Sequence, residues 1–289
     1  MTAWGQPPNS GAVFVTSAPA ERPGPVGRPA YSARVAAREL LYAMYERRLR
    51  RQLVGRPVPR HVGVMCDGNR RWARAAGAGD VSFGHQAGAD KIGDVLRWSA
   101  DAGVEVVTLW LLSTDNLSRQ ESELQPLLRI IEELVDELAA ERASWRIKLV
   151  GSLDLLPPET AHVLKAAAER TVDRRGLAVN IAVGYGGRQE IADAVRSLLH
   201  EHAKAGTTIE ELAEVLDVDH IAEHLYTRGQ PDPDLVIRTS GEQRMSGFLL
   251  WQSAHSEFYF CEAYWPDFRR IDFLRALRAY ADRHRRYGA

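Results

Sequence analysis

HVGVMCDGNRRW, residues 61 to 72, joins a short apolar run to an abrupt polar end. His61 to Cys66 has the length and β-branched character of a buried strand, and Asp67-Gly68-Asn69 is typical of a turn at its carboxyl end. In open α/β sheets, ligands bind at that end of the strands. Because Arg70 and Arg71 follow Asp67, the stretch predicts either a site for a magnesium-bound anion such as a diphosphate, or a solvated turn after a core strand.

Five further segments are typical of short buried strands, and they alternate with helical patterns. The strands are predicted at residues 104–112, 146–150, 177–183, 235–238 and 258–260, and the helices at 31–53, 84–102, 124–138, 158–172 and 188–203. This alternation predicts an α/β fold, a single domain with a mostly parallel central sheet of about six strands wrapped by helices. Residues 1–30 are rich in Pro and Gly and are expected to be a disordered tail, which leaves residues 31–289 for the domain.

The composition bounds the class of protein. Of 289 residues, 45% are apolar and 26% charged, which excludes a disordered or membrane-embedded chain. The net charge of -1 provides no general attraction for nucleic acid. Two cysteines in apolar runs and the lack of a signal-like segment predict a cytoplasmic location. The arginines at residues 47–51 leave two interpretations open, a peripheral contact with an anionic membrane or a solvated helix face.

Polar clusters follow three of the predicted strands, at residues 67–72, 113–119 and 238–246. In a parallel sheet these clusters would meet at one edge. Together they hold two carboxylates, two amides and five arginines: Asp67, Asp115, Asn69, Asn116, Arg70, Arg71, Arg119, Arg238 and Arg244. This inventory predicts one diphosphate pocket or two.

Other phosphate chemistries lack their motifs. The sequence has no P-loop, no glycine-rich dinucleotide motif, no adjacent aspartate pair and no zinc-ligand spacing. An aspartyl phosphatase would need a second aspartate where Asn69 stands. The glycine-rich segment at residues 183–188 leads from a strand into a helix and is interpreted as either a phosphate-binding loop or a plain tight turn.

Five motifs occur in a fixed order: HVGVMCDGNRRWA, FGHQAG, STDNLSR, GYGGR and DLVIRTSGEQRMSGFLLWQSAHSEFYF. In this order they resemble the cis-prenyltransferases, or Z-isoprenyl diphosphate synthases, from about residue 38 to the C-terminus. The resemblance is closest to actinobacterial short-chain enzymes that make Z,E-farnesyl diphosphate. It implies a magnesium-dependent homodimer that condenses geranyl or farnesyl diphosphate with isopentenyl diphosphate to form a Z double bond. The alternatives are a long-chain decaprenyl or undecaprenyl diphosphate synthase and, more remotely, a non-catalytic partner subunit.

The resemblance also implies roles for individual residues at the metal and the allylic substrate. Asp67 takes the place of the family's essential aspartate, which binds magnesium, and Glu257 that of a second magnesium-associated carboxylate. The allylic diphosphate and its prenyl chain would be held by Gly68, Asn69, Arg70, Arg71 and Trp72.

Further roles concern the second substrate. His85, Ser113 and Asn116 match a hydrogen-bonding set near the proton that is lost, and Thr114, Asp115 and Leu117 lie beside them. Asn116 is too weak a base to remove that proton, so the acceptor is Asp67, a water or a diphosphate oxygen. The isopentenyl diphosphate site is matched by Arg119, Arg238, Arg244, Met245 and Ser246. Arg286-Tyr287-Gly288 resembles a C-terminal motif that reaches the neighbouring subunit's site.

Product length is expected to depend on an apolar tunnel between the helices at residues 86–102 and 124–138. Burying one isoprene unit is worth roughly 3 to 4 kcal/mol, so a blocked tunnel would stop elongation. The bulky residues that could block it, or that simply pack in the core, are Ile92, Leu96, Trp98, Leu127 and Ile131. The chain departs from the family's pattern at Asp115 (usually Glu), Leu117 (usually Trp), Gly184 and Gly247 (both usually Asn), and in the lack of a basic residue at positions 79–82.

Overall fold

The computed structural model describes residues 28–287, and the side chains of residues 39–283. The chain divides into two compact units, Met1–Ala43 and Met44–Ala289. Helix α1, Arg28–Leu53, belongs to both, and every other described element belongs to the second unit. Most of the predicted tail lies outside the described residues, and its last three residues form the start of α1.

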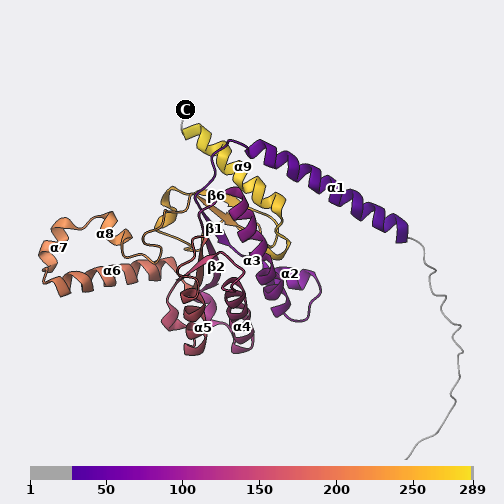
Figure 1. Cartoon of the computed structure of the whole chain (residues 1–289). Coiled ribbons are helices and arrows are strands. Elements are labelled where there is room, and N and C mark those ends of the chain that lie inside the picture. The colour runs from indigo at the N-terminus through magenta and orange to yellow at the C-terminus, as the bar shows by residue number, and fades with distance from the viewer. Residues whose placement is uncertain (1–27, 288–289) are drawn as a thin grey trace, which may run out of the picture. The chain divides into compact units, whose positions relative to one another are not determined.

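Among the described residues, six strands form one sheet in the order β3-β4-β2-β1-β5-β6, and each pair of neighbours is parallel. The bounds are β1 His61–Met65, β2 Val106–Ser113, β3 Arg146–Val150, β4 Ala178–Tyr185, β5 Leu235–Arg238 and β6 Glu257–Phe260. The predicted α/β fold with a parallel sheet of about six strands is confirmed (Figure 1).

Helices connect the strands. Their bounds are α2 Asn69–Ala75, α3 Ser82–Ala102, α4 Glu121–Leu138, α5 Pro158–Glu169, α6 Gly187–Ala205, α7 Ile209–Val215, α8 Val218–Ala222 and α9 Arg270–Tyr287, with short 3-10 helices η1 Asp115–Ser118, η2 Leu153–Leu155, η3 Gln252–His255 and η4 Trp265–Asp267. The five predicted helices correspond to α1 and α3 to α6, whereas α2 and α7 to α9 were not predicted. Helices α6 to α8 project away from the sheet (Figure 1).

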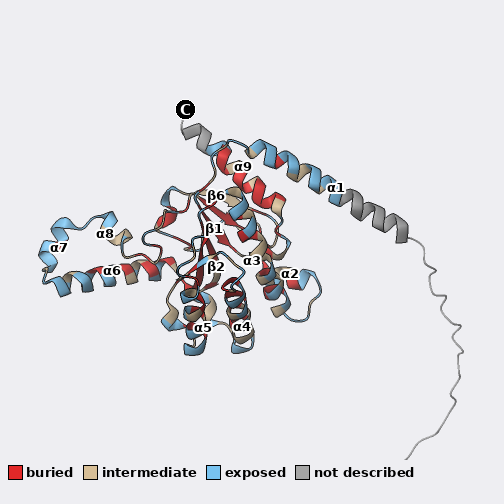
Figure 2. Cartoon of the chain, in the orientation of Figure 1, coloured by how far each residue is buried: buried red, intermediate tan, exposed pale blue. Residues whose placement is uncertain are grey.

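The core lies between the sheet and its helices (Figure 2). All residues of β1 and β4 are buried, which explains their nearly continuous apolar sequences. Leu96 is fully buried, and the Trp98 ring packs against Phe268 and Phe273, so both residues belong to the core. In α1, Leu49 is buried as the helical pattern predicts, but Leu41 is 66% exposed. None of the described helices is long and apolar enough to cross a bilayer.

A buried polar network ties the strands together below the carboxyl edge. His61 Nδ1 lies 2.7 Å from the carbonyl oxygen of Pro231, and Nε2 lies 2.8 Å from Thr108 Oγ1. Because a carbonyl oxygen only accepts, Nδ1 carries the proton and Nε2 accepts from the threonine. Asn180 Nδ2 donates to the same threonine oxygen and to Gln230 Oε1. The neutral tautomer of His61 is therefore built into the sheet.

Burial lowers the pKa of His61 from its ordinary 6.5 to about 4. Between these values the unfolded chain binds a proton that the folded chain does not, so stability rises with pH in this window and is lost as pH falls. The free energy of unfolding should fall by roughly 2 to 3 kcal/mol from pH 7.5 to 4.5 because of His61 alone. Urea unfolding of the wild type and of His61→Gln at several pH values measures this difference.

The matched control is His200→Gln, at an exposed position on α6. It should leave the pH dependence of the wild type unchanged. The same pH dependence in His61→Gln as in the wild type would contradict the assignment.

Candidate functional site

A cavity of 610 Å³ lies at the carboxyl ends of β1, β2 and β5. Its polar lining includes Asp67, Gly68, Asn69, Arg70, Arg71, Arg74, His85, Ser113, Asp115, Asn116, Arg119, Arg238, Glu242, Arg244 and Ser246. The three polar clusters of the sequence therefore meet at one edge of the parallel sheet, as predicted.

An ion pair joins two of these strand ends. Met65, the last residue of β1, is in register with Arg238, the last residue of β5. Arg238 Nη2 donates to Asp67 Oδ2 at 2.8 Å, and the arginine side chain is only 5% exposed. Burial acts to raise the pKa of Asp67, but hydrogen bonds from Arg238 and Ser240 and the charge of Arg71 lower it overall. Asp67 is therefore an ionised carboxylate at the floor of the cavity.

Gly68 turns the chain from β1 into α2. Its φ is +109°, and a Cβ atom at this position would lie 2.8 Å from the Tyr264 ring. Glycine is thus required, and the turn brings the α2 residue Arg71 back over Asp67. Arg71 Nη2 lies 3.3 Å from Asp67 Oδ1 and 2.7 Å from Ser240 Oγ.

A carboxylate that the sequence analysis did not single out lies among the arginines. Glu242 accepts from Arg71 Nη1 at 3.0 Å and also pairs with Arg244. It stands inside the motif RTSGEQRMS, where its position between two arginines was the available signal. Glu242 thus neutralises two side chains predicted to bind diphosphates.

Glu123, in the first turn of α4, likewise neutralises arginines, on the other side of the cavity. Its Oε1 lies 2.8 Å from Arg119, 3.5 Å from Arg70 and 3.9 Å from His85 Nε2. Burial and, to a smaller extent, the charge of Arg119 lower the pKa of His85 to about 4, although the charge of Glu123 acts to raise it. His85 is therefore neutral near pH 7 and offers hydrogen bonds without charge.

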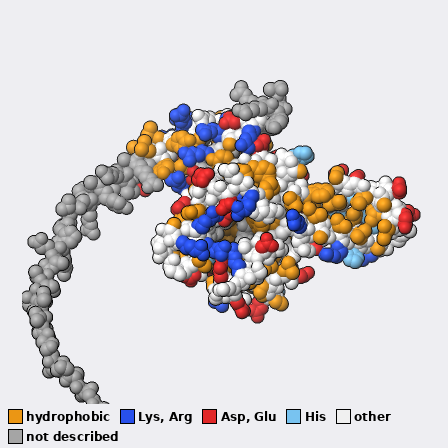
Figure 3. All heavy atoms as spheres, turned by 180° about the vertical axis from the view of Figure 1, so that it is seen from behind, with side chains coloured by type: hydrophobic (Ala, Val, Ile, Leu, Met, Phe, Trp, Pro, Cys, Tyr) orange, Lys and Arg blue, Asp and Glu red, His pale blue; other side chains and the backbone are white. Residues whose placement is uncertain are grey.

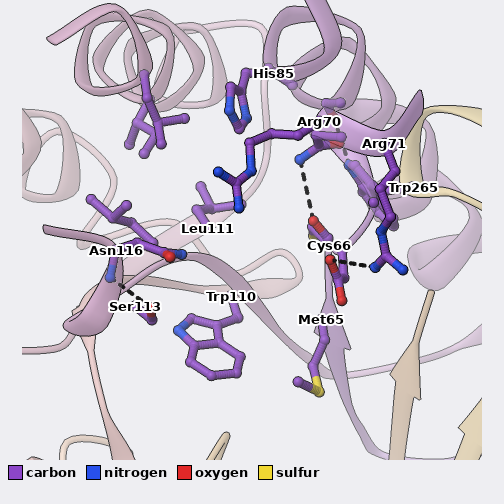
Figure 4. A pocket seen from close by; sticks show the side chains of 18 of the residues that line it. Met65, Cys66, Arg70, Arg71, His85, Trp110, Leu111, Ser113, Asn116 and Trp265 are labelled. Atoms are coloured by element: carbon purple, nitrogen blue, oxygen red, sulfur yellow. Dashed lines mark hydrogen bonds and ion pairs between the residues drawn. The ribbon is translucent and has the colours of Figure 1, made fainter. Parts of the chain in front are cut away.

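Asn116 is held in place by the end of β2. Its backbone N–H donates to Ser113 Oγ at 3.1 Å, which orients η1. In Figure 4, the side chains of Arg70, His85 and Asn116 converge on the same space from three different elements. This space is where a reacting group would meet both polar and apolar walls.

The other end of the cavity is apolar. It is lined by Ala89 and Ile92 of α3, Trp110, Leu111 and Leu112 of β2, and Leu127, Ile130, Ile131 and Leu134 of α4. Three of the predicted tunnel residues, Ile92, Leu127 and Ile131, are therefore in the wall, while Leu96 and Trp98 are not. The cavity thus combines cationic side chains with an extensive apolar lining.

Leu111 lines the cavity because β2 is irregular there. The register with β4 shifts between Trp110 and Leu112, which leaves Leu111 as an extra residue on β2. A regular strand would turn alternate side chains to opposite faces, whereas residues 110 to 113 all line the cavity. No signal in the sequence marks this bulge.

Comparisons with known proteins agree with this geometry. A family model described as "Putative undecaprenyl diphosphate synthase" matches residues 65–288. The chain belongs to this family, the cis-prenyltransferases. The predicted family is thereby confirmed.

Relatives in this family come from actinobacteria. The chain is 65% identical to "(2Z,6E)-farnesyl diphosphate synthase" of Thermobifida fusca over 248 residues, which cover 86% of this chain and 97% of the relative. It is 58% identical to "Isoprenyl transferase 1" of Corynebacterium diphtheriae, over 89% and 97% of the two chains. "Short-chain Z-isoprenyl diphosphate synthase" of Mycobacterium bovis is 56% identical over 87% and 97%.

A solved cis-prenyltransferase structure has the same fold. The crystal structure of lavandulyl diphosphate synthase from Lavandula x intermedia, in complex with dimethylallyl diphosphate, superposes with a TM-score of 0.71 at 33% identity. The match covers 78% of this chain and 95% of the other.

Five residues that the family resemblance assigned to the site do not line the cavity: Trp72, Thr114, Leu117, Met245 and Glu257. Trp72 stacks on Phe83 with ring centroids 5.5 Å apart. The backbone N–H of Thr114 donates to Tyr185 O, and the carbonyl of Met245 accepts from Phe248 N. These three residues therefore contact parts of the fold outside the cavity lining.

Glu257 does not lie beside Asp67 within the chain. It starts β6 in register with Leu235, which is itself in register with Val62 near the start of β1. Asp67 follows the other end of β1, and Glu257 binds Arg283 at 2.7 Å. A role for Glu257 at magnesium stays a prediction. Arg286-Tyr287-Gly288 lies outside the residues whose side chains are described.

The two glycines that replace the family's asparagines have a common backbone role. Gly184 and Gly247 have φ values of +60° and +83°. Asparagine tolerates this left-handed conformation better than other residues with a side chain, so both replacements preserve the backbone. Gly184 is the extra residue on β4 that follows the bulge at Leu111.

Asp67 fits a divalent cation only together with a ligand. Within the described residues, no group of three or more His, Cys, Asp or Glu side chains could hold a metal ion. Magnesium, however, commonly binds one or two carboxylates and completes its shell with substrate phosphates and waters. Asp67 is an ionised carboxylate beside several arginines that could hold a diphosphate, so it meets that requirement.

Proposed function

We propose that this cis-prenyltransferase condenses an allylic diphosphate, geranyl diphosphate, with isopentenyl diphosphate to give Z,E-farnesyl diphosphate. The observation that carries the proposal is one cavity whose lining combines arginines with a large set of apolar side chains from α3, β2 and α4. Relatives named as short-chain and (2Z,6E)-farnesyl diphosphate synthases support the short-chain product.

The charged end suits two diphosphates. Arg70 and Arg71 would hold the allylic one, and Arg119, Arg238 and Arg244 that of isopentenyl diphosphate. The allylic C–O bond breaks as the diphosphate leaves, and positively charged donors stabilise that leaving group. Asp67 would hold magnesium with the substrate oxygens, and the ion when bound neutralises further charge on the diphosphate.

Carbon–carbon bond formation then needs a proton acceptor. The double bond of isopentenyl diphosphate attacks the allylic carbon, and loss of the C2 proton creates the Z double bond. Asp67 and His85 are weak bases, because their pKa values are lowered, the latter to about 4. We therefore assign the proton to a diphosphate oxygen, with Asn116 and Ser113 as positioning groups.

Loss of the Asp67 carboxylate should abolish most of this activity. Asp67→Ala is expected to lower turnover by about a thousandfold, because the leaving group loses its stabilisation. Turnover of radiolabelled isopentenyl diphosphate with geranyl diphosphate measures the effect. Asp67→Asn should be similarly inactive while it keeps an acceptor for the buried Arg238.

The matched control is Asp173→Ala, an exposed aspartate after α5. It should retain wild-type turnover. Circular dichroism establishes that each variant is folded, and near-normal activity of folded Asp67→Ala would refute the proposal. Phosphate release without isopentenyl diphosphate would instead favour a phosphatase.

Product length should follow from the apolar wall. Ile131, on α4, is 3% exposed and lines the cavity, so Ile131→Ala would enlarge its apolar part. Because one buried isoprene unit is worth roughly 3 to 4 kcal/mol, the variant should shift products toward chains longer by at least one unit. Chromatographic sizing of the labelled products measures the shift.

Leu128→Ala is the matched control, since Leu128 is a buried leucine of the same helix outside the cavity lining. It should destabilise the fold without a change in product length. A C50 or C55 product from the wild type would overturn the short-chain assignment in favour of a long-chain synthase.

We also propose that the enzyme is a homodimer through α6 to α8. Large apolar side chains are exposed there: Val195, Leu199, Ile209, Val215, Leu216 and Val218. They form a continuous apolar area over this part of the molecule (Figure 3). Such patches on soluble proteins usually mark an interface.

Light scattering after size exclusion tests the assembly. Leu199→Glu should convert a dimer to a monomer, because it places a charge in the apolar area. Val172→Glu, at an exposed apolar position after α5, is the control and should remain dimeric. A monomeric wild type would refute the proposal.

Peripheral contact with an anionic membrane stays a prediction. Arg47, Arg48 and Arg51 are exposed on α1, as such a contact would require.

A further inference from the structure

The motif GYGGR, at residues 184–188, has no part in the proposed chemistry. None of its residues lines the cavity. Its backbone instead packs against another segment: Gly187 N donates to Gly247 O at 3.1 Å. A Cβ atom at Gly187 would lie 2.2 Å from that oxygen. The motif is therefore a docking point for the segment that carries Arg244 and Ser246, and the phosphate-loop interpretation is not supported.

The docked segment has an unusual backbone. Ser246 and Leu249 have φ values of +49° and +45°, with Gly247 between them at +83°. For residues with a side chain this left-handed conformation is unfavourable, and it persists only where the surroundings enforce it. The enforced shape matters for the cavity, because Arg238 Nη1 donates to Ser246 Oγ at 3.0 Å and to the carbonyl of Arg244.

The buried carboxylate of Glu190, next to the motif, holds the docked segment in this backbone conformation. Glu190 is 1% exposed and lies in the first turn of α6. Its Oε2 accepts from Tyr185 Oη at 2.5 Å, and Tyr185 Oη in turn accepts from Leu249 N at 3.1 Å. Its Oε1 accepts from Gln252 Nε2 at 2.9 Å and from Tyr226 N at 3.0 Å. One carboxylate thus anchors both Leu249 and Gln252.

The anchored segment also packs against a residue of the cavity wall. The Phe248 ring stacks on Trp110 at 5.1 Å and meets the Tyr185 ring edge-on at 6.1 Å. Trp110 lines the cavity, whereas Glu190 and Tyr185 do not. A change at Glu190 therefore reaches the cavity through the segment at residues 244–252 and through the Tyr185 ring, which meets the Trp110 ring edge-on at 6.1 Å.

We propose that Glu190 and Tyr185 are positioning residues that set the affinity for isopentenyl diphosphate by holding Ser246, Gly247 and Leu249 in their left-handed conformations. The inference rests on the proposed function, which places Arg244 and Ser246 at that diphosphate. The allylic site is built from Asp67 and α2, which these residues do not anchor. The effect should therefore separate the two substrates.

Glu190→Ala should raise KM for isopentenyl diphosphate about tenfold or more, the effect expected from losing a buried hydrogen-bond anchor. KM for geranyl diphosphate should change less than about threefold. Tyr185→Phe removes a single hydroxyl from an intact ring, so it folds if Glu190→Ala does not, and it should show the same separation. Glu190→Gln keeps an oxygen acceptor for Gln252 and Tyr226 and should rescue most of the affinity.

Glu201→Gln, an exposed carboxylate on the same helix, is the matched control and should match the wild type. Calorimetric binding of isopentenyl diphosphate in the presence of geranyl thiodiphosphate, an analogue that ionises poorly, gives the same comparison without turnover. A wild type that binds isopentenyl diphosphate but forms no product would contradict the proposed function alone. Equal losses for both substrates, or wild-type affinity in folded Glu190→Ala and Tyr185→Phe, would overturn the positioning role.

Discussion

The ion pair between Asp67 and Arg238 is the constraint on which the site depends. It exists because β1 and β5 are parallel neighbours in register, so that a carboxylate following one strand meets the last side chain of the other. A guanidinium that is almost completely buried needs such a partner, since an unpaired charge in that position would be strongly destabilising. The same two side chains belong to the proposed allylic and isopentenyl sites, so the sheet itself sets the distance between the substrates.

Carboxylates form ion pairs with the arginines of the cavity. Asp67, Glu123 and Glu242 together contact all five arginines predicted to bind diphosphates. Five positive charges this close together would repel one another, and the three carboxylates reduce the free-energy cost of that repulsion. The same ion pairs hold the arginine side chains in place around the cavity.

The sequence predicted the sheet and the location of the cavity because both follow from local patterns. Apolar runs that end in polar residues mark strand ends, and the parallel fold brings those ends together. Other parts of the arrangement do not follow from local patterns. Glu257 shares a motif with Arg238, but residues 239–256 carry the chain from the carboxyl end of β5 to the amino end of β6, where Glu257 lies. Leu96 lies one helical turn after Ile92 and is fully buried, and the Trp98 ring packs against Phe268 and Phe273. For both residues the core-packing alternative applies, because periodicity identifies a buried face and not which neighbour covers it. Glu242 was not singled out, because its pair with Arg71 forms only once the fold brings the turn after β5 next to α2.

In a regular strand, one side chain would have to fill the core and also line the cavity. The bulge in β2 assigns these two roles to different side chains. Core residues of a sheet must fill a space defined by neighbouring strands, so their size can vary little. Leu111 is outside that alternation and faces the cavity instead. A larger or smaller residue there would alter the room available to a hydrocarbon chain without repacking the sheet. Evolution could therefore adjust the product range of such an enzyme at this position while the folding of the domain stays almost unaffected.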